Sequence, residues 1–220
     1  MIITNENNID LMKRYPDRYF DIAIVDPPYA VGASNGVFGR GGNKAKNRRI
    51  KTELHHYSNH NEVPDEIYFD ELYRVSKNQI IWGANYYPEY LNHSGWIVWD
   101  KMKSDGLLSE AELAYQSFDK VVKIFKHEWE GFRKGKGSFE GTAKSIIHPN
   151  QKPVKLYKWC LDKYAKEGDK ILDTHLGSGS SAIAAHYANI AFVGLEINST
   201  CFEAMEKRFK NETSQTVLTF

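Results

Sequence analysis

The chain has 220 residues, of which 41% are hydrophobic and 26% charged, enough for one full-sized α/β domain spanning residues 1–220. Its formal net charge of +1 excludes a global excess of positive charge as the means of binding nucleic acid. No apolar run approaches the ~20 residues needed to cross a bilayer, and the polar start predicts no signal peptide. Cys160 and Cys201 are far apart, and we expect both to be reduced and buried. These features predict a cytoplasmic protein without a membrane segment.

The first half of the chain alternates between expected strands and helices. The apolar patterns predict a short helix over residues 8–14, a helix over 64–75, and extended segments over 20–25, 79–82, 96–99, 112–117 and 120–125. Because a strand–helix–strand unit is followed by consecutive strands, we expect an α/β sheet, mostly parallel with an antiparallel edge.

Two irregular segments interrupt this pattern. Residues 32–61 contain several glycines and no periodic apolar face, which predicts a flexible loop. Its basic run is either a solvated face or a phosphate-binding element, and it comprises Arg40, Lys44, Lys46, Arg48, Arg49 and Lys51. Residues 127–145 have room for a small target-recognition insert and contain Arg133, Lys134 and Lys136. We expect no metal site, since no further ligand pair accompanies His55, His56 and His60.

The carboxyl-terminal part has the clearest pattern. We predict a helix over residues 154–165, strands over 170–173 and 191–195, and between these strands an alanine-rich helix. Thr200 and Glu203 have capping-box spacing, which predicts that a last helix opens at Thr200.

The motif Asp26-Pro27-Pro28-Tyr29 directly follows the strand predicted over residues 20–25. The loop after such a strand lies at the carboxyl edge of the sheet, where open α/β folds bind ligands. Two prolines fix φ and remove two backbone donors, which leaves nearby carbonyls free to accept hydrogen bonds. A carboxylate, bare carbonyls and an aromatic face on one stiff turn suit a flat, amine-bearing ring, although an ordinary turn remains the simpler alternative.

A second motif, a glycine turn, follows the strand over residues 170–173. Gly177-x-Gly179-x-x-Ala182 fits the dinucleotide pattern, and Glu196 at the end of the next strand can accept hydrogen bonds from two ribose hydroxyls. A nicotinamide- or flavin-dependent oxidoreductase is therefore one interpretation. Asp173 before the turn disfavours it, because an acid there repels a pyrophosphate and attracts an ammonium group. An oxidoreductase also gives the Asp26–Tyr29 motif no role.

The order of the motifs resembles that of the beta-class amino-group DNA methyltransferases, in which the catalytic half precedes the S-adenosylmethionine half. The resemblance spans nearly the whole chain and rests on Asp26 to Tyr29, Ile80 to Asn85, Gly95 to Lys101, Glu112 to Tyr115, His148 to Pro153, Asp173 to Ser181, and Glu196. It implies a Rossmann-like methyltransferase sheet with helices on both faces, permuted motif order, and a bacterial or phage origin.

The resemblance also implies a cofactor site. Asp173 would face the methionine moiety of S-adenosylmethionine and Glu196 its ribose. The turn residues Gly177, Ser178, Gly179 and Ser180 would line the site, and Lys152 and Pro153 would face the amino-acid end. A solvated lysine is the alternative for Lys152.

The sequence departs from the family pattern at one point. Thr174 and His175 stand where the family usually has Pro and Phe. His175 could pack by the cofactor in its neutral form. We expect His148 and His175 to pack or hydrogen-bond rather than to catalyse.

The implied reaction is methyl transfer to the exocyclic N6 of an adenine flipped out of double-stranded DNA. Asp26 and the Pro27 carbonyl would accept the amine hydrogens, Pro28 would stiffen the turn, and Tyr29 would stack on the base. In this family Asp at the first position is commoner in adenine-N6 enzymes and Ser in cytosine-N4 enzymes. Cytosine-N4, RNA and protein-amide methylation and a non-enzymatic DNA-binding module remain alternatives, and beta-class relatives often form homodimers.

Overall fold

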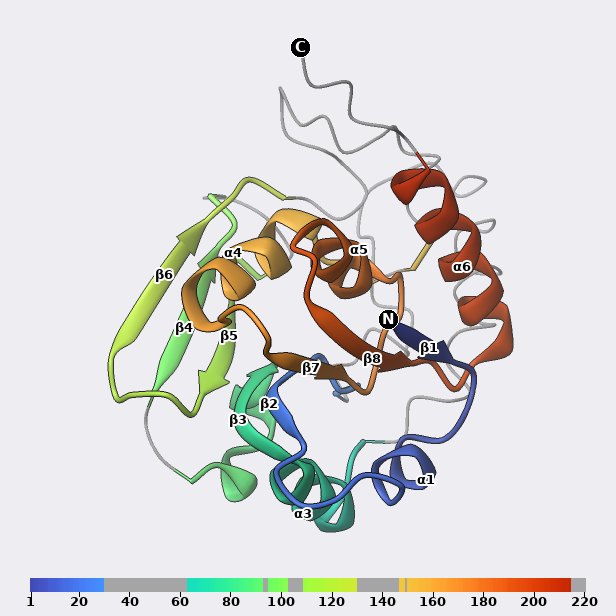
Figure 1. Cartoon of the computed structure of the whole chain (residues 1–220). Coiled ribbons are helices and arrows are strands. Elements are labelled where there is room, and N and C mark those ends of the chain that lie inside the picture. Colours follow the sequence, from blue (N-terminus) through green and yellow to red (C-terminus); the bar gives the residue numbers. More distant parts are fainter. Residues whose placement is uncertain (30–62, 93–94, 103–108, 130–146, 149, 215–220) are drawn as a thin grey trace, which may run out of the picture.

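In the part of the chain that the structure describes, an eight-stranded sheet carries helices on both faces (Figure 1). The computed structural model describes residues 1–29, 63–92, 95–102, 109–129, 147–148 and 150–214. The strands are β1 (Ile2–Thr4), β2 (Phe20–Val25), β3 (Ser76–Trp82), β4 (Trp96–Asp100), β5 (Ala111–Gln116), β6 (Val122–Lys126), β7 (Lys170–Asp173) and β8 (Ala191–Leu195). The helices are α1 (Asn8–Met12), α3 (Glu66–Val75), α4 (Val154–Tyr164), α5 (Ser180–Tyr187) and α6 (Ser199–Thr213), with 3-10 turns η3 (Ala84–Tyr86) and η4 (Pro88–Tyr90).

The strand order is β1-β8-β7-β2-β3-β5-β4-β6. The pairings make the sheet mostly parallel, as expected for a Rossmann-like α/β fold. The antiparallel strand, however, is β5, which lies inside the sheet between β3 and β4 rather than at an edge. The reason is that β4 lies between β5 and β6 and pairs with both, so these two strands, which are joined near Asp119, are not direct neighbours. As a result, β5 begins where the parallel strands around it end.

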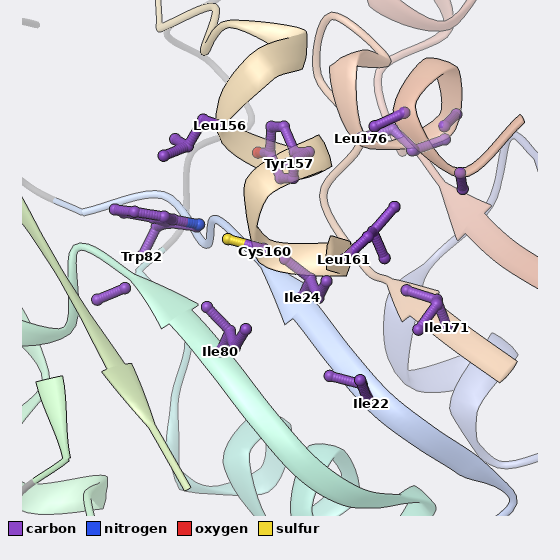
Figure 2. Packing of buried hydrophobic residues seen from close by; sticks show 14 of the residues in the cluster. Ile22, Ile24, Ile80, Trp82, Leu156, Tyr157, Cys160, Leu161, Ile171 and Leu176 are labelled. Carbon is purple, nitrogen blue, oxygen red and sulfur yellow. The ribbon is translucent and has the colours of Figure 1, made fainter. Parts of the chain in front are cut away.

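The central strand β2 is buried on both faces. In β2, Ile22 and Ile24 point to the face covered by α4 and α5, and Ala23 and Val25 point to the face covered by α1 and α3. Figure 2 shows the first of these cores, in which the α4 side chains pack onto the strands. Two-sided burial explains why β2 is a continuous apolar run rather than an alternating one.

Two helix starts differ from the sequence-based predictions. Helix α6 begins at Ser199, and the Asn198 side chain caps it by accepting from the Cys201 amide at 3.0 Å, so Thr200 does not open the helix. Helix α3 begins at Glu66, and Asp65 caps it by accepting from the Tyr68 amide at 3.1 Å. In both cases an Asx side chain with extended backbone takes the cap position, where its oxygen reaches a free amide.

Several predictions concern residues outside the described ranges. The loop over residues 32–61 and residues 130–145 of the second irregular segment lie there, together with Arg40, Lys44, Lys46, Arg48, Arg49, Lys51, Arg133, Lys134, Lys136, His55, His56 and His60. Within the described part of the chain, no helix has the length and apolar character that crossing a membrane requires.

Candidate active site

The carboxyl ends of β2, β7 and β8 meet at one edge of the sheet and form a cavity of about 480 Å³. This volume is in the range of small-molecule and cofactor sites. Ten of the thirteen predicted catalytic and cofactor-binding residues line it: Asp26, Pro27, Pro28, Tyr29, Lys152, His175, Gly177, Ser178, Ser180 and Glu196. Among the predicted site residues that the structure describes, three do not line it: Asp173, Gly179 and Pro153, the last of which directly precedes α4.

The glycine turn needs glycine for two separate reasons. Gly177 and Gly179 have φ of +49° and +76°, in the left-handed region that side chains with a Cβ rarely adopt. A methyl group at Gly179 would also lie 2.6 Å from Met205 Cγ of α6. The turn is therefore closely packed against α6 on one side, and its backbone at Gly177 borders the cavity on the other.

Glu196 directly follows β8 and lines the cavity. Its Oε2 accepts from the Gly177 amide at 2.9 Å, and its Oε1 accepts from the Asn198 amide at 3.0 Å. These bonds fix the carboxylate between the glycine turn and the start of α6. Each carboxylate oxygen can accept a further hydrogen bond, so Glu196 can serve as an acceptor for a polar ligand.

Asp173 is buried and accepts hydrogen bonds from residues on either side of the glycine turn. It is 1% exposed, its Oδ1 accepts from the His175 amide at 3.0 Å, and its Oδ2 accepts from the Ser181 hydroxyl. Burial raises the pKa of Asp173 to about 7, although both hydrogen bonds favour the charged form. In this structure Asp173 stabilises the start of α5, and its predicted contact with a cofactor stays a prediction.

His175 is neutral and fixed by hydrogen bonds at both ring nitrogens. Asn8 Nδ2 lies 3.2 Å from Nε2, and Thr174 Oγ1 lies 2.9 Å from Nδ1. Because an amide nitrogen can only donate, Nε2 accepts and Nδ1 carries the proton. The chain of bonds continues from Thr174 to the Tyr68 hydroxyl at 2.7 Å. Burial lowers the pKa of His175 to about 3, which keeps the ring neutral at physiological pH.

The Asp26–Tyr29 motif is held by aromatic side chains that follow β3. The Tyr87 hydroxyl donates towards the Pro28 carbonyl at 2.5 Å and lies 3.1 Å from the Pro27 carbonyl. Tyr29 stacks on Tyr86, with ring centroids 4.6 Å apart and an interplanar angle of 10°. Segment 83–87 therefore fixes both the carbonyls and the aromatic ring of the motif.

Asp26 is the first member of a buried chain of charges. The Lys152 ammonium contacts Asp26 Oδ2 and lies 3.2 Å from Glu112 Oε2, and Glu112 Oε1 lies 2.6 Å from the Lys101 ammonium. Lys152 is 4% exposed, so the alternative of a solvated lysine is wrong. Asp26 Oδ1 is buried and has no hydrogen-bond partner among the described residues. An unpaired buried acceptor is costly, and Asp26 is among the residues that line the cavity.

Sequence reasoning assigned no role to three residues around the motif: Lys101, Glu112 and Tyr87. Each lies in or next to a block that carries the family resemblance, but nothing in the local pattern says what it contacts. The available signal was position, since Lys101 follows an expected strand and Glu112 starts one. Position alone does not show that Lys101 and Glu112 lie close together. That conclusion requires the order of the strands in the sheet, which the sequence pattern left open.

The fold and the cavity define a class: Rossmann-like proteins that bind a small molecule against a glycine turn at the carboxyl edge of the sheet. A family model described as DNA methylase, of the N6/N4 type, matches residues 20–207. The chain therefore belongs to the amino-group DNA methyltransferases of the N6/N4 family. This membership confirms the family resemblance and decides against a nicotinamide- or flavin-dependent oxidoreductase.

Individual proteins are similar over nearly the whole chain. The type II methyltransferase M.HpaI of Haemophilus parainfluenzae is 23% identical over 94% of this chain and 73% of its own length. The crystal structure of an M1.HpyAVI–SAM complex matches with a TM-score of 0.56 at 15% identity, covering 94% of this chain and 98% of that one. The cytosine-N4-specific PvuII DNA methyltransferase matches with a TM-score of 0.57 at 10% identity, covering 97% and 93%. The two structural matches support the fold.

Proposed function

We propose that this protein transfers a methyl group from S-adenosylmethionine to the exocyclic N6 of an adenine in double-stranded DNA. The observation that carries the proposal is the unpaired, buried Asp26 Oδ1, on a residue that lines the same cavity as Pro27, Pro28 and the glycine turn. Family membership supports amino-group methylation of DNA, and the choice of adenine is the finer step of the proposal.

The residues around the glycine turn fit a nucleoside-containing methyl donor. Gly177 presents backbone to the cavity, Glu196 offers carboxylate oxygens suited to ribose hydroxyls, and neutral His175 offers a flat ring. S-adenosylmethionine, when bound, supplies an electrophilic methyl group on a sulfonium centre. The cavity volume of about 480 Å³ accommodates a ligand of this size class beside a target base.

Asp26 activates the amine in this scheme. The lone pair of an exocyclic amine is delocalised into the ring, which makes the nitrogen a poor nucleophile. Asp26 Oδ1 accepts one amine hydrogen and the Pro27 carbonyl accepts the other, since this carbonyl keeps a lone pair beside its weak contact with Tyr87. The nitrogen moves towards tetrahedral geometry, and the carboxylate stabilises the positive charge that develops on it.

Tyr29 and the basic segments have supporting parts in the proposal. A base inside a duplex cannot reach Asp26, so the target leaves the stack at a cost of a few kcal/mol. Stacking on Tyr29 offsets part of that cost. Residues 32–61 and 127–145, which follow Tyr29 and β6 in the sequence, are the segments we propose to contact DNA.

The choice of adenine rests on Asp26 itself. Adenine-N6 members of the family more often have Asp at this position, and cytosine-N4 members more often have Ser. Digestion of methylated DNA to nucleosides, followed by mass spectrometry, distinguishes N6-methyladenine from N4-methylcytosine. N4-methylcytosine as the product would overturn the adenine assignment and leave amino-group methylation intact.

Asp26→Ala tests the mechanism in the full chain. Transfer of tritiated methyl groups to double-stranded DNA should be abolished in this variant. Calorimetry checks that the variant still binds S-adenosylmethionine, and the thermal unfolding temperature checks that it is folded. The matched control is Asp70→Ala, an exposed aspartate on α3 outside the cavity. RNA and an amide-bearing protein are assayed in parallel, and transfer to either one in preference to DNA would contradict the proposed substrate.

A further inference from the structure

Lys152 is linked by ion pairs to two charged residues that do not line the cavity, Glu112 and Lys101. Lys101 follows β4, and Glu112 lies near the start of β5. Because β5 is antiparallel to both of its neighbours, its start lies at the same sheet edge as the ends of β3 and β4. Neither Lys101 nor Glu112 lines the cavity. Both therefore act on the site through Lys152 and through the electrostatic effect of their charges on Asp26.

The contacts form one continuous chain of alternating charge. Lys101 meets Glu112 at 2.6 Å, Glu112 meets Lys152 at 3.2 Å, and Lys152 contacts Asp26. The exposed fractions of these side chains are 13% for Lys101, 21% for Glu112, 3% for Lys152 and 15% for Asp26. Two ammonium groups and two carboxylates balance, so the buried cluster is neutral overall. A neutral, mutually paired arrangement is the form in which buried charges are tolerated.

Glu112 competes with Asp26 for the Lys152 ammonium. Lys152 lies between the two carboxylates: it donates a hydrogen bond to Oδ2 of Asp26, leaves Oδ1 unpaired, and forms an ion pair without a hydrogen bond with Oε2 of Glu112 at 3.2 Å. Burial disfavours the charged form of Glu112, but Lys152 and Lys101 together outweigh burial and lower its pKa. Burial and the charge of Glu112 raise the pKa of Asp26, against the opposite effect of Lys152.

We infer that Glu112, supported by Lys101, is a positioning residue that holds Lys152 away from Asp26 Oδ1 and so keeps this oxygen open for the target amine, an inference that rests on the proposed function. Without the negative charge of Glu112, the Lys152 ammonium moves towards Asp26 and pairs with both of its oxygens. The acceptor for the amine is then occupied by a competing donor. The cofactor residues around Gly177 and Glu196 are unaffected.

The pH dependence of the reaction also depends on the electrostatic interaction between Glu112 and Asp26. The charged and titratable groups whose charges act on or respond to Asp26 are Lys152, Glu112, Lys101, Tyr29, Tyr87, Tyr157 and Asp173. Among them Glu112 raises the pKa of Asp26 through its negative charge, after the larger effect of burial. Removing that charge lowers the pKa of Asp26, so the acid limb of the kcat profile moves to lower pH. A residue with a merely structural role would not move this limb.

Glu112→Gln in the full chain is the test, because it removes the charge and keeps the shape. We expect kcat for DNA methylation to fall by on the order of 10- to 100-fold, the cost of a misplaced reacting group. KM for S-adenosylmethionine should stay within about twofold, as for an interaction that leaves cofactor binding intact. Lys101→Met, which acts one step further away, should give a smaller fall in the same direction. The matched control is Glu110→Gln, an exposed carboxylate two residues away that should keep wild-type kinetics.

The outcomes separate this inference from the proposed function. An unchanged kcat and acid limb in Glu112→Gln, with active wild-type protein, would overturn the inference and leave the function standing. If wild-type protein transfers no methyl group to DNA, the proposed function fails instead. Carbon-13 NMR titration of the Asp26 carboxyl in the ligand-free protein then tests the coupling without activity. A pKa of Asp26 that is the same in wild type and Glu112→Gln overturns the inference, and a lower pKa in the variant supports it.

Discussion

The ammonium of Lys152 contacts the carboxylate of Asp26 across 126 residues of sequence. Lys152 stands directly before α4, and its carbonyl accepts from the Ser180 hydroxyl at the start of α5 at 2.7 Å. The ion pair therefore connects the glycine-turn side of the cavity with the motif that follows β2. A contact of this kind makes the position of Asp26 depend on the cofactor half of the fold.

Lys152→Met should destabilise the protein and abolish methyl transfer. Removing one partner of a buried ion pair leaves an uncompensated charge, at a cost of about 3–5 kcal/mol in the free energy of unfolding. The pKa of Asp26 rises further when its ammonium partner is lost, so at a given pH a larger fraction of the carboxyl is protonated and unable to accept the amine at both oxygens. Urea unfolding measures the first effect, and tritiated-methyl transfer to DNA measures the second.

The control for this variant is Lys155→Met, an exposed lysine one turn along the chain. A surface substitution of this kind changes stability by no more than about 0.5 kcal/mol. If Lys152→Met were as stable and active as this control, the ion pair would have no part in the site.

Local patterns were sufficient to predict much of the fold. Strand β2 is a continuous apolar run because both of its faces are buried, and the glycines at 177 and 179 signal a turn that only glycine adopts easily. The carboxyl ends of parallel strands lie at one edge. Together these rules predict Asp26, Gly177 and Glu196 at the carboxyl edge of the sheet, which is where the cavity lies.

The remaining part of the site depends on non-local order. Glu112 reaches Lys152 only because β5 inserts antiparallel between β3 and β4, and the sequence predicted an antiparallel strand at the edge. The sequence also does not predict that the Asp173 oxygens accept from Ser181 and the His175 amide, because this is a result of turn geometry that no spacing rule contains. Buried hydrogen bonds of this type follow from packing.

Tyr87→Phe should loosen the catalytic turn. The Tyr87 hydroxyl is the donor that holds the Pro28 carbonyl, so its removal should lower the free energy of unfolding by about 1 kcal/mol. We also expect kcat to fall by on the order of tenfold, because the Pro27 and Pro28 carbonyls lose their fixed orientation. Steady-state kinetics with a DNA substrate and urea unfolding measure the two effects.

Tyr73→Phe is the matched control, since the Tyr73 hydroxyl donates a comparable bond to the Tyr90 carbonyl at 2.7 Å outside the cavity. It should show a similar loss of stability with kcat unchanged. Equal losses of kcat in both variants would contradict a specific role for Tyr87.

His175→Phe should change how stability depends on pH. Burial lowers the pKa of His175 to about 3, so as pH falls below about 6.5 the unfolded chain binds a proton that the folded protein does not. Wild-type stability is therefore lost progressively as pH falls from about 6.5 towards 3. The phenylalanine variant lacks this contribution, so between pH 7.5 and 5.0 it should lose about 1–2 kcal/mol less than wild type.

Urea unfolding at the two pH values measures the difference. Burial also lowers the pKa of His148, to about 4, but that residue is present in both proteins and its contribution cancels. Parallel pH dependence in wild type and His175→Phe would show that His175 is protonated to the same extent in the folded and unfolded states.

Gly83→Ala should impair catalysis through Tyr29. Gly83 has φ of +69°, and a methyl group there would lie 2.6 Å from Tyr29 Cδ1, so the ring must leave its stack with Tyr86. The left-handed backbone at an alanine costs about 1–2 kcal/mol in the free energy of unfolding. The displaced Tyr29 ring should reduce methyl transfer by on the order of tenfold, as for a misplaced positioning group. Binding of S-adenosylmethionine should not change. Gly168→Ala separates the two effects, because φ is +87° there and nothing lies within 4 Å. It should lose similar stability and keep full transfer, whereas full transfer in Gly83→Ala would show that the orientation of Tyr29 is not required.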